Sequence, residues 1–144
     1  MANHCRLAAA SAVAAVDAVV NICDAGGTGT LVIYTGAEPA YADDGVGDEV
    51  ATCTLSATAY GSASADGANK WAEANLTATA SDTSATGNVA AVTYFRLKSG
   101  GGATVLQGTI GTSGADLNLN AVIIGAGAQV DITALEVRCP YNQA

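Results

Sequence analysis

Short segments with a two-residue hydrophobic period constrain this chain most. In a β-strand successive side chains point to opposite faces, so alternating apolar and polar residues indicate a half-buried strand. Turns rich in Gly, Ser and Asp separate the segments. The segments that fit are residues 30–35, 50–59, 70–80, 89–98, 104–110, 117–124 and 129–137. About seven or eight short strands of this kind predict an all-β fold, a β-sandwich of jelly-roll or immunoglobulin-like type.

The last quarter of the chain, residues 109–137, carries the strongest apolar pattern. Its two predicted strands are joined by Gly125–Ala128, and we expect the rest of the chain to pack against that pair. Within the final strand the apolar phase changes between Ile132 and Leu135. A β-bulge near Thr133 would place both residues on the core side, so the sequence predicts a bulge there.

Residues 4–23 have helical spacing instead. Asn3 is a candidate N-terminal cap, and Gly26 supplies a positive-φ stop. We therefore divide the chain into an N-terminal helix or arm, residues 1–26, and a β-sandwich, residues 27–144, within a single compact domain. The apolar face of the helix is predicted to contain Val13, Val16, Val20 and Cys23.

Composition limits the partners. Half of the residues are hydrophobic, but few are aromatic, so the core is thin and association, as a homodimer or homotrimer, is expected to add stability. The formal net charge is −8, and no cluster of Lys and Arg occurs. Phosphate backbones and anionic membranes both require such a cluster, so we expect neither nucleic acid nor a membrane as a partner. The apolar run Leu7–Val16 is too short to span a bilayer.

Catalytic residues are scarce. His4 is the only histidine, and no nucleophile elbow, zinc-protease motif or phosphate-binding loop is present. We expect no enzymatic activity, no metal and no cofactor. The acidic segment 38–49 lacks the ligand spacing of a calcium loop, so we interpret it as a solvated loop.

Four cysteines offer the most informative chemistry, and their spacing fits no zinc site. Cys5 and Cys23 lie at opposite ends of one predicted helix, about 27 Å apart, which is too far for a disulfide. Cys23 and Cys53 occupy apolar phases and are either reduced core residues or an internal bridge. Cys5 and Cys139 lie near the two ends and are either an inter-chain disulfide or free thiols.

Three stretches follow the predicted Ala-rich N-terminal helix: GTLVIYTGAEP (29–39), VTYFRLKSGGGATVLQGTIGTSGADLNLN (92–120) and GAQVDITALEV (127–137). In this order the chain resembles small virion structural proteins of tailed bacteriophages. The resemblance implies a protein that decorates, cements or links the capsid and binds the major capsid protein or other virion proteins. It also implies a location on the capsid exterior after assembly in the bacterial cytoplasm. The four cysteines depart from what the resemblance implies, and they suggest disulfides that form after release, since the cytoplasm would keep them reduced.

Two other functions remain open. One is a neck or tail component of the same virion, such as a collar, tube or adaptor. The other is a carbohydrate- or host-binding fibre-type domain, for which Tyr41 beside Asp43 and Asp44 is the candidate sugar site, because such sites place exposed aromatic rings next to carboxylates.

Overall fold

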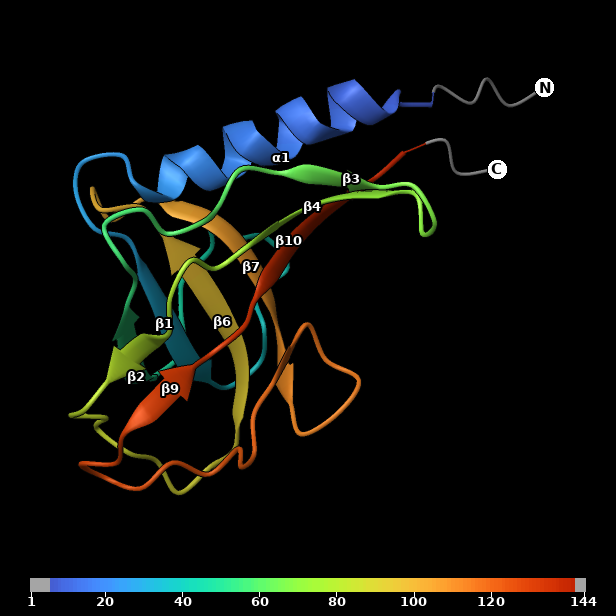
Figure 1. The fold of residues 1–144 in the computed structure, drawn as a ribbon. Helices are drawn as coiled ribbons and strands as arrows, with labels where there is room; N and C mark the ends of the chain where they lie inside the picture. Colours follow the sequence, from blue (N-terminus) through green and yellow to red (C-terminus); the bar gives the residue numbers. More distant parts are fainter. Residues whose placement is uncertain (1–5, 142–144) are drawn as a thin grey trace.

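The computed structural model describes residues 6–141, and the fold is mostly β (Figure 1). A curled seven-stranded sheet, a three-stranded sheet and one N-terminal helix make up the molecule. The elements are α1 (Ala9–Cys23), β1 (Thr30–Thr35), β2 (Glu49–Thr54), β3 (Ser64–Asp66), β4 (Trp71–Asn75), β5 (Ala80–Asp82), β6 (Val92–Lys98), β7 (Thr104–Gly111), β8 (Leu117–Asn118), β9 (Val130–Ile132) and β10 (Glu136–Pro140).

The large sheet has the strand order β8-β7-β6-β1-β2-β5-β9. At its centre β1 pairs antiparallel with both β2 and β6, and Thr30 lies opposite Thr54 on one side and Lys98 on the other. The sequence prediction for β1 is confirmed, and the predicted hairpin that is now β6 and β7 is confirmed with its ends shifted. These strands are rich in β-branched and aromatic residues, which pack well on a pleated surface.

The small sheet has the order β10-β4-β3, and the chain enters it from β9 through residues 133–135. The predicted β-bulge near Thr133 is therefore wrong, because the chain changes sheets there. The change of sheet produces the same burial: Ile132 and Leu135 are both buried, one at the end of the first sheet and one before the second. Strands that pass between sheets in this way form the corners of sandwiches.

The expected pairing within residues 109–137 is also wrong. Only Leu117–Asn118 of the first predicted strand is extended, and it pairs parallel with β7, whereas β9 pairs with β5. The intervening segment is a loop held by backbone bonds: Val92 N–H donates to the Val122 carbonyl at 2.8 Å, and Asn88 N–H to the Ile124 carbonyl at 2.9 Å. The predicted strand 70–80 likewise divides into β4 and β5. Together with the division of residues 129–137 into β9 and β10 and the additional strand β3, this brings the number of strands in the described residues to ten.

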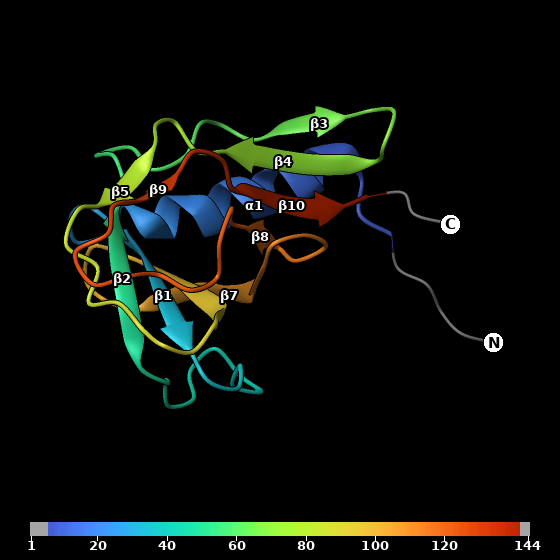
Figure 2. The ribbon, with the colours of Figure 1, turned by 90° about the horizontal axis from the view of Figure 1, so that it is seen from below.

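Helix α1 begins at Ala9, five residues later than predicted, and its N-cap is Ala8, which makes no side-chain cap bond. The proposed cap Asn3 lies outside the described residues. The helix ends as predicted before Gly26, whose φ is 80°. It packs on β3, β4, β10 and β7, and Figure 2 shows it between the small sheet and the β1–β7 side of the large one. No helix in residues 6–141 is long and apolar enough to cross a membrane.

One hydrophobic cluster joins the helix to both sheets. It contains the buried helix residues Ala12, Val16, Val20 and Cys23 together with Leu31, Phe95 and Leu97 of the large sheet and Ala72 of the small one. The predicted apolar stripe is thus confirmed for three of its residues, while Val13 is only partly buried. Because the helix supplies one wall of this shared core, the segment 1–26 does not act as a free arm over its helical part.

The acidic loop between β1 and β2 is largely exposed, as predicted, and so are its carboxylates. Backbone groups of this loop also bond to side chains of the large sheet. There the rings of Tyr34 and Tyr94 stack with centroids 5.1 Å apart, and Gly47 N–H donates to the Tyr94 hydroxyl at 2.7 Å. Gln107 Nε2 donates to the Pro39 carbonyl at 2.8 Å. The loop therefore covers a second, smaller apolar cluster on this face.

Candidate functional site

A groove of about 730 Å³ lies between β7 of the large sheet and β10 of the small one. In Figure 2 β10 passes across α1 and β7 lies below the helix. The apolar part of the lining comes from both sheets and contains Trp71, Phe95, Leu106, Leu117, Leu135 and Val137. Grooves lined by apolar side chains between two strand edges suit an extended peptide, because main-chain bonds and side-chain pockets can act together.

On one side of the groove, β7 has an unpaired edge. Its inner edge pairs with β6, but on its outer edge β8 pairs only with Ile110 and Gly111. Among residues 6–141 no strand pairs with the outer edge over Thr104–Gly108. An unpaired edge of this length offers backbone donors and acceptors to another strand.

On the other side, β10 pairs only with β4. Tyr141 N–H donates to the Lys70 carbonyl at 2.9 Å. This bond shows which residues of β10 direct their backbone N–H and C=O groups to β4 and which direct them to the other side. Since antiparallel strands direct alternate backbone groups to one neighbour, Val137 and Cys139 direct theirs to β4. Glu136 and Arg138 therefore direct their backbone N–H and C=O groups outward, towards the groove.

The floor of the groove is closely packed at Gly108. This residue lies opposite Phe95 in the β6–β7 register, and a Cβ added to it would lie 2.8 Å from Cε1 of the Phe95 ring. Phe95 itself is 1% exposed. The aromatic ring thus lies directly against the backbone of β7 at Gly108 and leaves no room for a side chain at this residue.

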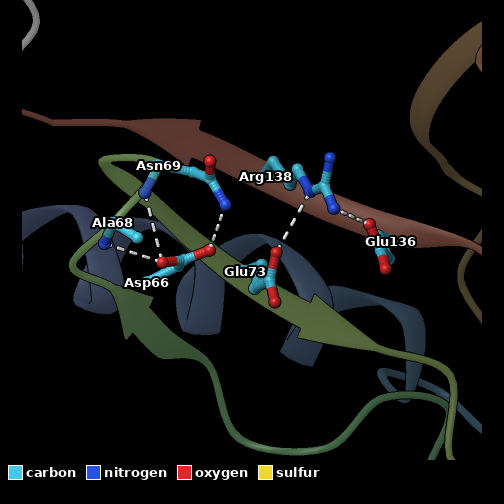
Figure 3. A network of polar contacts seen from close by, with 6 residues as sticks. All are labelled: Asp66, Ala68, Asn69, Glu73, Glu136 and Arg138. Atoms are coloured by element: carbon cyan, nitrogen blue, oxygen red, sulfur yellow. Dashed lines mark hydrogen bonds and ion pairs between the residues drawn. The ribbon is translucent and has the colours of Figure 1, made fainter.

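Charged side chains form the rim on the β10 side (Figure 3). Arg138 Nε lies 3.1 Å from Oε2 of Glu73, and its guanidinium also pairs with Glu136 on the same strand. All three side chains are partly exposed, so these ion pairs orient the rim and add little to stability.

The β3–β4 turn beside the rim is fixed by Asp66. Its carboxylate accepts bonds from the backbone N–H of Ala68 at 2.8 Å and of Asn69 at 3.2 Å, and from Asn69 Nδ2 at 2.6 Å. The Asn69 side chain is the main reason that the pKa of Asp66 is lowered. The Tyr141 hydroxyl donates to the Asp66 carbonyl at 2.8 Å, which ties the end of β10 to this turn.

Two further aspartates accept hydrogen bonds from backbone N–H groups of β7 and β2 that no neighbouring strand in residues 6–141 accepts. Asp116 Oδ2 accepts the outward N–H of Thr109 at 2.8 Å and its hydroxyl at 2.7 Å. Asp82 Oδ2 accepts the N–H of Thr52 at 2.7 Å. The backbone bond from Thr109 is the main cause of a lowered pKa at Asp116, and the bond from Thr52 at Asp82.

These aspartates predict acid sensitivity. A carboxyl group whose pKa is lower in the folded than in the unfolded chain stabilises the fold fully above its unfolded pKa of about 3.9, and loses this effect as the pH falls through the folded pKa. We expect the urea midpoint to be nearly constant from pH 8 to pH 5 and to fall below pH 4. Asp82→Asn should lower the midpoint at pH 7 and make the acid loss shallower. An unchanged acid slope in this variant would contradict the assignment.

The structure separates the four cysteines. Cys23 and Cys53 are buried free thiols, and Cys53 Sγ donates to the Val130 carbonyl at 3.7 Å. Cys139 is also free and half-buried; it lies in β10 on the core side with Val137 instead of at an exposed end. Cys5 lies outside the described residues. The pairing of Cys5 with Cys139 therefore stays a prediction.

Burial makes the two core thiols unreactive. It raises the pKa of Cys23 to about 11 and of Cys53 to about 12, so at pH 8 only about one molecule in a thousand or fewer carries either thiolate. We expect iodoacetamide at pH 8 to leave both cysteines unmodified in the native protein and to alkylate both in urea. Peptide mass mapping reads this out, and native alkylation at the unfolded rate would contradict the burial.

Among residues 6–141 no group of three or more His, Cys, Asp or Glu side chains is placed to hold a metal ion. Tyr41 is 73% exposed, and its N–H donates to Asp44 Oδ2 at 3.3 Å, so the candidate sugar site is a single exposed ring beside one carboxylate. The groove is the larger and better defined feature.

Comparison of the chain with protein-family models, curated proteins and solved structures gives no match. Function must therefore be inferred from the groove and its neighbours. The sequence did not reveal the groove, because which strand edges stay unpaired depends on the order of the strands.

Proposed function

We propose that this chain is a non-enzymatic virion structural protein that decorates or links the capsid of a tailed bacteriophage. In this proposal it binds the major capsid protein or other virion proteins on the capsid exterior and associates with further copies of itself. For the fold we propose a β-sandwich whose second sheet has only three strands and whose open end is covered by α1. The resemblance of residues 29–39, 92–120 and 127–137 to small virion proteins supports the role.

The observation that carries the proposal is the groove with an unpaired strand edge on each side. Extended edges such as Thr104–Gly108 are normally covered or blocked in a protein that works alone, since they invite other strands. A subunit that must join a lattice has a use for them. The arrangement favours strand-to-strand assembly over a reaction at a catalytic centre, and we propose no enzymatic activity and no cofactor.

The covering loop supports the same role. Because the loop 36–48 bonds to Tyr94 beside Tyr34, it covers the part of the outer face of the large sheet around these two rings. Association is thereby directed to strand edges, which fix the relative orientation of subunits through hydrogen-bond register. Defined orientation is what a closed, symmetric assembly requires.

Immunogold labelling of particles tests the proposal. Antibodies against the purified protein should label the heads of tailed phage particles released by the culture from which the gene was taken, and pre-immune serum should not. Label confined to the neck or tail would overturn decoration in favour of a neck or tail component. Particles that carry no label, confirmed by mass spectrometry of the purified virion, would overturn the virion role itself.

A further inference from the structure

The segment before α1 has the pattern of a strand that fits the groove. Arg6, Leu7 and Ala8 are exposed, and Ala8 has extended backbone angles, with φ −72° and ψ 155°. Leu7 is 44% exposed, so its side chain is available to a partner. In the sequence of residues 4–7 the apolar Cys5 and Leu7 share one phase of a two-residue period, and the polar His4 and Arg6 share the other.

We propose that residues 1–8 of a second copy of this chain enter the groove and pair antiparallel with the outer edge of β10. In this register Leu7 lies opposite Val137 and Cys5 opposite Cys139, both on the core side. Glu136 and Arg138 supply the outward backbone groups, as the alternation along β10 requires. This inference concerns contacts between copies and does not rest on the virion role.

The register places the two cysteines where a disulfide can form. Because Cys139 directs its backbone groups to β4, it occupies a non-hydrogen-bonded position on its outer side. Opposed residues at such positions have Cα atoms about 4.5 Å apart, which lies within the range found for disulfides. Leu7 against Val137 continues the same face and covers the apolar floor.

The register places Arg6 directly opposite Arg138, and like charges in this position repel. Glu136 and Glu73 already pair with Arg138 and offset this repulsion. Two positive and two negative side chains then share the rim. Residues 1–8 contain Arg6 and no Asp or Glu, in a chain whose formal net charge is −8, so they add no negative charge to this rim.

The occupant must come from another copy. In the antiparallel register Ala8 lies beside Glu136, at the start of β10. In its own molecule Ala8 immediately precedes α1, at the end of the molecule where β10 finishes (Figure 1). Within one molecule Ala8 lies near the end of β10 and therefore cannot also lie beside Glu136 at the start of this strand.

Oxidative trapping tests the pairing. With oxidised glutathione as the oxidant, the Cys5 and Cys139 thiols lose two protons and two electrons to form one disulfide, and each glutathione disulfide becomes two glutathione thiols. We expect a reductant-sensitive dimer on a denaturing gel, with a Cys5–Cys139 peptide in the mass spectrum. Cys5→Ser and Cys139→Ser should each abolish it. A Cys5–Cys5 or Cys139–Cys139 peptide, or a Cys5–Cys139 bridge at monomer mass, would overturn the proposal.

Two matched pairs test the register. In a Cys5→Ser, Cys139→Ser background, Leu7→Cys with Val137→Cys should cross-link at least tenfold faster than Leu7→Cys with Arg138→Cys, whose thiols point to opposite faces. Equal rates would overturn the register.

Glu136→Pro removes an outward N–H that β4 does not use, at a strand that already accepts Pro140, and Glu136→Ala keeps that N–H. The proline variant should lose most of the Cys5–Cys139 cross-link and the alanine variant should keep it. Equal cross-linking in both would overturn the edge pairing. Far-UV circular dichroism verifies that each variant is folded, and the cysteine pairs decide the question if the proline variant is not.

Discussion

Phe95→Ala should lower the free energy of unfolding by about 3–5 kcal/mol, as expected for truncating a buried aromatic ring. Phe95 is 1% exposed, belongs to the main core cluster and lies against the backbone of Gly108. Its removal takes away both the buried apolar area and the support beneath the floor of the groove. Urea unfolding followed by circular dichroism measures the change.

Val89→Ala is the control for this experiment. Val89 is 96% exposed and makes no comparable contact, so its truncation should change stability by less than about 0.5 kcal/mol. The usual effect of a single mutation is about 1 kcal/mol. If the free energy of unfolding of Phe95→Ala differed from that of the wild type by less than this, the ring would not be a closely packed part of the core.

Gly100→Ala should be nearly as damaging, at about 3 kcal/mol, the upper part of the range for overpacking. The β6–β7 turn and the loop after α1 cross so closely that a Cβ on Gly100 would lie 2.2 Å from the Gly27 carbonyl carbon. Gly100 N–H donates to the Cys23 carbonyl at 3.1 Å, which fastens the helix end to the turn. An added methyl group must separate these two backbones and with them the helix from the sheet.

The neighbouring glycine provides a matched control. A Cβ on Gly101 would meet nothing closer than 3.7 Å, and its N–H bond to the Ala25 carbonyl would remain. Gly101→Ala should therefore leave the protein as stable as the wild type or slightly more stable, since alanine restricts the unfolded chain. Thermal unfolding of the two variants side by side decides the matter, and equal melting temperatures would refute the close crossing.

The parts of the fold that could be predicted are those where side chains are large and branched. The run Thr30–Thr35 is the clearest case, because only a strand buries four consecutive large residues on both faces. Cys23 and Cys53 were likewise placed in apolar phases, and both are fully buried. In each case the local pattern and the tertiary environment agree.

The parts that could not be predicted have small side chains or depend on distant partners. Residues 77–79 are Thr, Ala and Thr, and this short stretch did not show that the predicted strand 70–80 is interrupted. Val122, Ile123 and Ile124 favour a strand, but the carbonyls of Val122 and Ile124 accept bonds from distant Val92 and Asn88, which hold this segment as a loop. The groove depends on β8 covering only two residues of β7, and no local pattern encodes that limit. Its occupancy by residues 1–8 stays a proposal for the same reason, since strand pairing between segments is a property of the whole assembly.

The position of β1 at the centre of the large sheet sets the order in which the chain can fold. Thr30 pairs with Lys98, and the far edge of the sheet is completed by Val130–Ile132. During synthesis β1 must therefore wait for most of the chain to leave the ribosome before its second neighbour exists. Sheets dominated by such distant pairings fold slowly, in milliseconds to seconds. Newly made chains should thus depend on protection from premature aggregation. The rate of folding, more than the final stability, should limit how much folded protein a cell produces.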